Sequence, residues 1–297
     1  MADPPPTSSG FVALAGRPNV GKSTLVNALI GEKVAIVSDR PQTTRRAIRG
    51  VASGENWQLV LVDLPGVQRP RDVLTERMQN AVERELAGSD TALFVLDGEQ
   101  RIGPGDRFIA HALSGSSAPV VIAVNKVDRL DRPRTVLALA AAAALGLDAE
   151  IFPVSARAGT GVAELRAELV ARLPAGPFYF PVGVRTDQPE HVLLAELVRE
   201  QVLSRTRQEV PHAIEVEVSE VERRRPGLTV VVAQIWVEAE SQKAILIGAG
   251  GRMVKTIGSA ARKELERRLG HRVQLELRVR VRRHWRTDEG LLDRLGV

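Results

Sequence analysis

Eight residues near the start of the chain place glycine, lysine and serine at a fixed spacing. They are Gly16-Arg17-Pro18-Asn19-Val20-Gly21-Lys22-Ser23, between an apolar run at 11–15 and a segment of helical spacing at 24–30. Glycine lets the backbone turn sharply, so successive N–H groups point into one concavity beside the positive end of a helix. This pattern predicts a polyphosphate site that extends to Thr24, with Lys22 on the phosphates and the Ser23 hydroxyl on a bridging Mg²⁺. A chance glycine-rich turn is the alternative, and the flanking strand and helix disfavour it.

Two further stretches offer groups to the same metal and phosphates. Asp63-Leu64-Pro65-Gly66 follows an apolar strand at 58–62. The Asp63 carboxylate can hold Mg²⁺ through water, and the Gly66 N–H can meet a γ-phosphate. The polar segment 34–49 has the composition of a loop and contains two threonines. We favour Thr44 over Thr43 as a second hydroxyl for the metal, against the alternative of a plain connecting loop.

A base-recognition signal follows the next two strands. Asn125-Lys126-Val127-Asp128 comes after the strand at 120–124, and Ser155-Ala156-Arg157 after the strand at 151–154. Asp128 can accept hydrogen bonds from guanine N1–H and N2–H₂ together, whereas adenine has neither donor. The Ala156 N–H is placed to contact guanine O6. Each motif is weak alone, but four in this order at strand ends predict a guanine-nucleotide site.

The first part of the chain alternates strands with helices, which predicts an α/β fold with a mostly parallel sheet and helices on both faces. Expected helices are 73–87, 106–113, 134–145 and 162–173, and a further strand is 91–96.

Composition bounds the remaining possibilities. A length of 297 residues indicates about two domains, and the absence of cysteine excludes disulfides and thiolate metal sites, as in a reducing cytoplasm. No apolar run approaches the roughly 18 residues of a membrane span. We expect residues 1–9 to be a disordered tail and 10–175 the nucleotide domain. Residues 176–190 read as a linker, whose aromatic residues 178–180 are expected to anchor it on a domain surface rather than to stack bases.

Positive charge gathers in the last third. Residues 1–190 hold 21 Lys and Arg against 21 Asp and Glu, while residues 252–286 hold 12 against 3. Such an excess is the footprint of a site for nucleic acid; a solvated basic face or an anionic membrane surface is the alternative.

The same third has a different order of elements. A helix at 191–207, a hairpin of strands at 213–221 and 228–237, helices at 241–247 and 252–269, and a strand at 273–281 give αββααβ. A glycine-rich turn joins the last two helices. This is the layout of an α+β KH domain, predicted here at 191–287 and followed by a tail at 288–297. The expected RNA-binding residues are Ile247, Gly248, Ala249, Gly250, Gly251, Arg252 and Lys255.

With both halves in place, the chain resembles the Era family of bacterial GTPases with a C-terminal KH domain. The resemblance rests on the motifs above and on Pro41-Gln42-Thr43-Thr44-Arg45, Gly176-Pro177-Phe178-Tyr179, Ala195-Glu196-Leu197-Val198-Arg199-Glu200, Glu209-Val210-Pro211-His212 and Ser241-Gln242-Lys243. It spans residues 10–287. In one place the chain departs from it, because Leu64 stands where the family usually has threonine.

The resemblance implies a GTP- and GDP-binding, Mg²⁺-dependent switch that binds the 3′ end of 16S ribosomal RNA and assists 30S assembly. We expect a cytoplasmic monomer, and the resemblance adds peripheral membrane contact, which is also described for the family. A nucleotide-regulated membrane-surface GTPase is therefore the second hypothesis, and an ATP-dependent P-loop enzyme is opposed by Asp128.

The expected catalytic residues are Lys22, Thr44, Gly66 and Asn19. Val67 stands where many GTPases carry a glutamine that orients the attacking water, so we expect slow intrinsic hydrolysis. Resemblance to potassium-dependent relatives gives Asn19 a role in holding K⁺ against the phosphates, with an ordinary turn residue as the alternative.

Overall fold

The apolar runs of the first part of the chain form one six-stranded sheet in the computed structural model, which describes residues 7–40, 42–67, 70–206 and 213–296. Its order is β2-β3-β1-β4-β5-β6, and only β2 runs antiparallel to its neighbour. The mostly parallel sheet predicted from the alternating pattern is thus confirmed. The strands are β1 (Ser8–Ala15), β2 (Ile48–Ser53), β3 (Trp57–Asp63), β4 (Thr91–Asp97), β5 (Val120–Asn125) and β6 (Ala149–Pro153).

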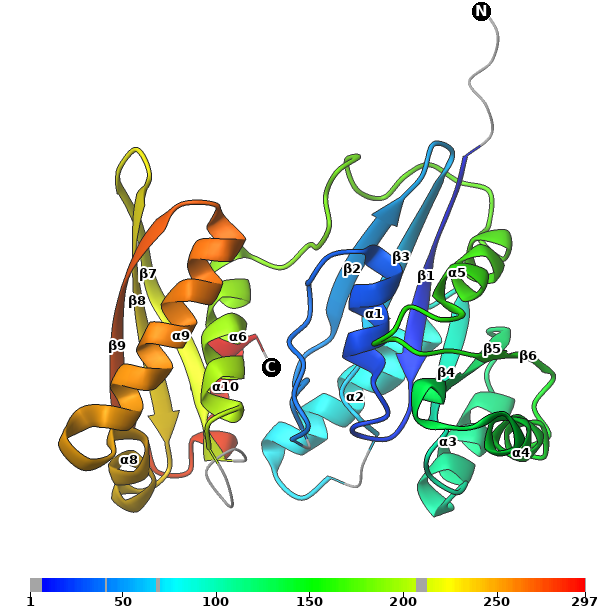
Figure 1. Ribbon diagram of the computed structural model, residues 1–297, viewed down its shortest axis with the longest axis horizontal. Coiled ribbons are helices and arrows are strands. Elements are labelled where there is room, and N and C mark those ends of the chain that lie inside the picture. The colour runs from blue at the N-terminus through cyan, green and yellow to red at the C-terminus, as the bar shows by residue number, and fades with distance from the viewer. Residues whose placement is uncertain (1–6, 41, 68–69, 207–212, 297) are drawn as a thin grey trace, which may run out of the picture. The chain divides into compact units, whose positions relative to one another are not determined.

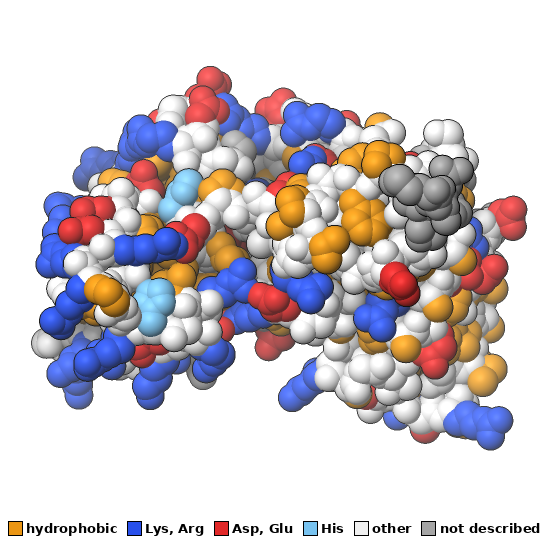
Figure 2. Space-filling model, turned by 90° about the horizontal axis from the view of Figure 1, so that it is seen from above, with side chains coloured by type: hydrophobic (Ala, Val, Ile, Leu, Met, Phe, Trp, Pro, Cys, Tyr) orange, Lys and Arg blue, Asp and Glu red, His pale blue; other side chains and the backbone are white. Residues whose placement is uncertain are grey.

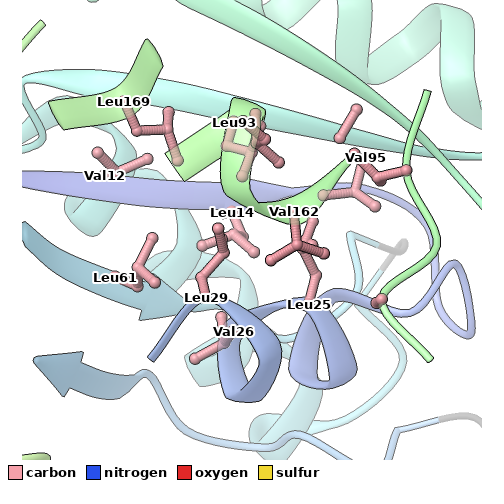
Figure 3. Packing of buried hydrophobic residues seen from close by; sticks show 14 of the residues in the cluster. Val12, Leu14, Leu25, Val26, Leu29, Leu61, Leu93, Val95, Val162 and Leu169 are labelled. Atoms are coloured by element: carbon pink, nitrogen blue, oxygen red, sulfur yellow. The ribbon is translucent and has the colours of Figure 1, made fainter. Parts of the chain in front are cut away.

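Helices cover both faces of this sheet (Figure 1). Because successive strand residues point to opposite faces, Val12 and Leu14 pack on one side while Ala13 and Ala15 pack on the other. Leu25 of one helix and Leu169 of another lie in the first of these layers (Figure 3). That layer is made by α1 (Lys22–Ile30) and α5 (Val162–Ala171), and the second by α2 (Val73–Ala87), α3 (Pro104–Ser114) and α4 (Arg132–Ala143).

Parallel pairing gathers the ends of the central strands at one edge of the sheet. The register places Leu14 beside Asp63 and Asp97 beside Asn125. Ligands of open α/β sheets bind outside the carboxyl ends of the strands. The motifs that follow β1, β3, β5 and β6 therefore face one site.

Two expectations about chain segments are wrong. Ser8 and Ser9 already belong to β1, so the disordered tail predicted for residues 1–9 is too long, and residues 1–6 lie outside the described residues. The loop predicted at 34–49 ends earlier, because β2 begins at Ile48. Gly50 interrupts the strand pattern, and a Cβ there would lie 2.0 Å from Ile30 Cδ1 of α1, so a larger residue would require the Ile30 side chain to move.

The expected linker is fastened to the sheet over most of its length. Val51 N–H donates to Arg185 O at 2.8 Å. The buried Gln58 side chain clasps the backbone of Phe180 through two hydrogen bonds of 2.8 and 2.9 Å. The Tyr179 ring lies 4.8 Å from the Phe11 ring, so this aromatic residue anchors the linker on the domain surface as predicted. The chain divides into two compact units: unit 1 holds most of the residues up to Asp187, and unit 2 holds the residues from Gln188 onward together with two short segments near residues 38–40 and 72–74.

Unit 2 shows the predicted αββααβ order. Its sheet is β7-β8-β9, with β7 and β8 antiparallel and β8 and β9 parallel. Helices α6 and α9 pack against each other and against the sheet. The elements are α6 (Glu190–Leu203), β7 (Glu215–Arg225), β8 (Leu228–Val237), α8 (Glu240–Ile247), α9 (Arg252–Leu269) and β9 (Arg272–Val281).

The end of the chain is helical, which corrects the tail predicted at 288–297. Helix α10 (Glu289–Leu295) begins with the Asp288 side chain accepting from Leu291 N–H at 3.0 Å. Three leucines of this helix are buried. The preceding Trp285 is also buried, and its Nε1–H donates to Ala213 O at 2.9 Å. Within the described ranges, no helix is long and apolar enough to cross a membrane.

Candidate nucleotide site and nucleic-acid interface

The loop between β1 and α1 needs glycine at both ends. Gly16 has φ 155°, and a Cβ there would lie 2.6 Å from Val95 O. Gly21 has φ 97°, and a Cβ there would lie 2.3 Å from Asn125 Nδ2. Neither backbone position has space for a side chain. Residues 16–21 therefore form a tight turn that ends where α1 begins at Lys22, with Pro18, Asn19 and Val20 in its middle.

Lys22 lies buried inside this loop. Its Nζ donates to Gly16 O at 3.0 Å and to Arg17 O at 3.2 Å. Burial lowers the pKa of Lys22 to about 8, and attraction by Asp63 offsets part of that effect. The ammonium group is thus held by backbone carbonyls in the concavity where polyphosphate is expected.

Three side-chain oxygens converge beside Lys22. The hydroxyls of Ser23 and Thr44 are 3.0 Å apart, and Thr44 Oγ1 donates to Asp63 Oδ2 at 3.3 Å. Asp63 is fully buried, and its Oδ1 has no hydrogen-bond partner among the described residues. Burial raises the pKa of Asp63 to about 6, partly opposed by Lys22 and by the two hydroxyls. A buried carboxylate with two adjacent hydroxyls is a set of hard oxygen ligands, so these residues fit Mg²⁺.

The segment after Asp63 lies against the phosphate loop. A Cβ on Gly66 would come within 2.7 Å of Pro18 Cγ, so only glycine permits this approach. Leu64 is buried and packs with Ala13 and Val82. The departure from threonine at this position therefore adds to the core instead of removing a ligand. Pro65, which lies between Leu64 and Gly66 in the sequence, is also buried.

The base-recognition motifs are tied to the phosphate loop by Asn125. Its Nδ2 donates to Val20 O at 2.9 Å, and its Oδ1 accepts from Ala156 N–H at 3.0 Å. The sequence assigned that Ala156 N–H to guanine O6, and the structure instead shows it engaged by Asn125. Ser155 Oγ donates to Asp128 Oδ1 at 2.6 Å, which orients the carboxylate predicted to read guanine.

Two buried aspartates support this site and were missed in the sequence. Asp97 Oδ2 lies 2.7 Å from Lys126 Nζ and so holds the lysine of the base motif. Asp106 Oδ1 accepts from Arg17 Nε at 2.8 Å, while its Oδ2 accepts from Gly103 N–H at the start of α3. Asp97 ends a buried strand at the same edge of the sheet as Asp63. A carboxylate at that position in the sequence could have indicated that Asp97 belongs to the site.

Val67 offers no polar group to a water molecule. It is half-buried and packs on the apolar layer with residues of the second face. Asn19 has a left-handed backbone, φ 65°, at the apex of the phosphate loop. That conformation is typical of asparagine in turns and is compatible with either role considered for it.

The glycine-rich turn of unit 2 is open on its outer side. Gly250 and Gly251 have φ 60° and 77°, and a Cβ on either would meet no atom within 4 Å. Gly248 is constrained, because a Cβ there would lie 2.8 Å from Met253 Cβ. Helix α9 begins directly after the turn, so its N–H groups and the side chains of Arg252 and Lys255 stand beside it. Ile247 is the last residue of α8 before the turn, and Ala249 lies within the turn.

A hollow of about 330 Å³ lies between α9 and β9, and its lining begins at Val254 in the first turn of α9. Its apolar residues offer a surface for bases, while its cations are suited to phosphates. Sequence patterns did not reveal it, because its walls come from two elements. It is lined by Val254, Lys255, Gly258, Ser259, Arg262, Leu275 and Leu277.

Comparisons with known proteins agree with both units. The sequence model of a family described as "50S ribosome-binding GTPase" matches residues 11–126, and that of the KH domain matches residues 209–286. GTPase Era of Mycobacterium bovis is 46% identical over 97% of this chain and 98% of its own length. GTPase Era of Mycolicibacterium smegmatis is 45% identical over the same shares.

Solved structures of Era give the same result. One, a complex of Era with MgGDPNP and nucleotides 1506–1542 of 16S ribosomal RNA, is 37% identical with a TM-score of 0.93, over 98% of this chain and 99% of the other. A variant of Aquifex aeolicus Era bound to GDP and AlF4⁻ is 35% identical with a TM-score of 0.92 over the same shares. The motifs, the two folds and these full-length likenesses establish that the chain belongs to the Era family of GTPases.

Proposed function

We propose that unit 1 binds GTP and GDP with Mg²⁺ and hydrolyses GTP, and that unit 2 binds the 3′ end of 16S ribosomal RNA. Nucleotide state then controls RNA binding during assembly of the 30S subunit in the cytoplasm. The observation that carries the nucleotide half is the meeting of Ser23, Thr44 and Asp63 oxygens beside buried Lys22. The solved Era complex with MgGDPNP and 16S ribosomal RNA supports both halves.

The residues of the site fall into groups that would bind the metal, the phosphates and the base. Ser23, Thr44 and Asp63 would hold Mg²⁺, whose charge supports the β- and γ-phosphates. Lys22 would neutralise the same phosphates, and the backbone N–H groups of residues 16–24 other than Pro18 would surround them. Asp128, oriented by Ser155, selects guanine, while Asn125 and Lys126 fix the loop around it.

Hydrolysis is expected to be slow without a further activator. Val67 cannot orient water, so Gly66 N–H, Lys22 and Thr44 are left to stabilise the charge that develops on the γ-phosphate. Asn19 is proposed to hold a K⁺ ion there. GTP turnover measured in KCl and NaCl at equal ionic strength tests this, and equal rates would show that Asn19 is an ordinary turn residue.

The switch is proposed to act through the segments that contact the γ-phosphate. Thr44 and Gly66 belong to different loops, and both lose a partner when the γ-phosphate leaves. A nucleotide changes RNA binding only if the two nucleotide states differ in RNA affinity. Fluorescence anisotropy with a 16S 3′-end oligonucleotide, in GTP analogue and in GDP, measures that difference directly.

A separate experiment tests the RNA half by itself. Replacing Gly250 and Gly251 by aspartate places negative charge and bulk where the RNA backbone must approach. RNA binding should be lost while GTP hydrolysis by unit 1 continues at its basal rate. The membrane-surface alternative would be favoured if the wild-type protein bound anionic lipid vesicles but no RNA, and if the aspartate variant kept its lipid binding.

A further inference from the structure

Three arginines from different elements converge at the end of unit 2 opposite the glycine-rich turn. Strand pairing brings two of them together, because Leu228 pairs with Arg225 on one side and with Arg272 on the other. Arg262 reaches the same place from α9. All three line a hollow of about 700 Å³ beneath the β7–β8 turn. Lys and Arg side chains gather over unit 2 in the view of Figure 2.

These arginines differ from their neighbours in having no carboxylate partner. Arg223 pairs with Glu190 at 3.3 Å, and Arg224 pairs with Glu222 at 2.8 Å. For Arg225, Arg262 and Arg272, the described parts of the chain provide no ion pair. One carboxylate, Glu266, lines the hollow, and its Oε1 accepts from Val273 N–H at 3.2 Å. The walls therefore carry three positive charges against one negative charge.

The hollow continues the one beside the glycine-rich turn. Arg262 and Leu275 line both hollows, so there is a path along α9 and β9 from one to the other. From Arg252 at the turn to Arg262 the helix rises about 15 Å, at 1.5 Å per residue. A chain bound at the turn would reach the arginines by following this path.

We propose that Arg225, Arg262 and Arg272 form a second phosphate site, which binds the RNA backbone after the strand leaves the glycine-rich turn. A KH turn clamps about four nucleotides, so this site extends the footprint beyond them. Guanidinium groups bind phosphate oxygens in pairs of parallel hydrogen bonds, and three of them around one hollow favour a phosphodiester over a base. The site adds affinity and fixes the path of the strand without reading its sequence. This inference rests on the proposed function.

The test compares two double variants that remove equal charge from the same region. Arg225→Gln with Arg272→Gln removes two arginines of the hollow. Arg223→Gln with Arg224→Gln removes two paired arginines of the same hairpin and is the matched control. All four side chains are exposed, and thermal unfolding will verify that both variants fold. Each protein is titrated with a six-nucleotide and a sixteen-nucleotide RNA from the 16S 3′ end, across salt.

With the longer RNA, the Arg225→Gln, Arg272→Gln protein should bind about tenfold more weakly than wild type. The slope of log affinity against log salt should fall by about 1.4, at roughly 0.7 for each lost single-strand phosphate contact. With the six-nucleotide RNA its affinity should stay within about twofold of wild type, and the control protein should match wild type with both RNAs.

Three results would overturn the inference. Equal losses in the two double variants would mean a diffuse basic surface, and equal losses with the two RNAs would place the arginines at the turn itself. Unchanged RNA binding together with lost binding to phosphatidylglycerol vesicles would assign the hollow to lipid headgroups. Failure of the proposed function gives a different result. In that case Gly250→Asp and Gly251→Asp would not lower the affinity of the otherwise wild-type protein for either RNA.

Discussion

The nucleotide site of unit 1 and the second hollow of unit 2 place their charged residues in opposite ways. In unit 1, Lys22, Asp63 and Asp97 are buried, and each contacts other polar groups of the site. In unit 2, the arginines of the second hollow are exposed and face solvent. A buried charge needs a fixed partner, whereas an exposed charge is available to a ligand. Unit 1 thus positions a small ligand accurately, and unit 2 offers a long surface to a flexible polyanion.

The largest effect on ligand binding should come from replacing glycine by alanine in the phosphate loop, and the same replacement in the glycine-rich turn of unit 2 is the comparison. Gly21→Ala combines φ 97° with a Cβ 2.3 Å from Asn125, so we expect lost GTP binding, by at least about 100-fold, and a lower melting temperature. Gly251→Ala has φ 77° and open space, so only about 1 kcal/mol of backbone strain should appear. Calorimetric GTP titration and thermal unfolding of both variants test this. Similar losses in the two variants would contradict the contrast between the units.

Much of this arrangement is predictable from residue types, and the reasons for the exceptions are local. Strand β2 was not predicted because Gly50 breaks its pattern, and the close approach of the Ile30 side chain to this glycine appears only in the fold. The roles of Asp97 and Asp106 depend on Lys126 and Arg17, which lie far away in sequence. Motif residues act at fixed spacings along the chain, so the sequence reveals them. Supporting residues such as Asp97 and Asp106 act on partners that only the tertiary fold brings close.

The second hollow illustrates the same limit. Charge counting identified a basic third but could not separate Arg225 from Arg223 and Arg224. That distinction depends on strand register and on which carboxylates are near. The final helix is a different case, since the spacing of Leu291, Leu292 and Leu295 after Asp288 is a readable helical signal.

A second, smaller effect concerns the choice of base. Asp128→Asn keeps one acceptor oxygen, so it removes one of the two hydrogen bonds from guanine, which is worth about 1.5–3 kcal/mol because the carboxylate is charged. GTP affinity should fall roughly 10- to 100-fold, while RNA affinity of the nucleotide-free protein stays at the wild-type value. Fluorescent GDP displacement and RNA anisotropy measure the two quantities. Undiminished preference for GTP over ATP in this variant would mean that Asp128 does not read the base.

The smallest effect is a pH dependence confined to unit 1. Burial holds the pKa of Lys22 at about 8, and bound phosphate favours its charged form. Above pH 8 the lysine must therefore gain a proton on binding, so affinity falls as pH rises. GTP should bind about threefold more weakly at pH 8.5 than at pH 7.5, from the fraction of Lys22 still charged. Calorimetry in two buffers of different ionisation enthalpy should show proton uptake at pH 8.5; its absence would contradict the lowered pKa.

The central claim is that a guanine-nucleotide site governs an RNA surface in the same chain. The most direct measurement is RNA affinity for a 16S 3′-end oligonucleotide and a scrambled control, each with GTP analogue and with GDP, across salt. If unit 1 governs unit 2, RNA binding will depend on RNA sequence and will differ between the two nucleotides. Equal, steeply salt-dependent binding of both RNAs in both nucleotide states would contradict it, because unit 2 would then be a general polyanion surface without coupling to unit 1.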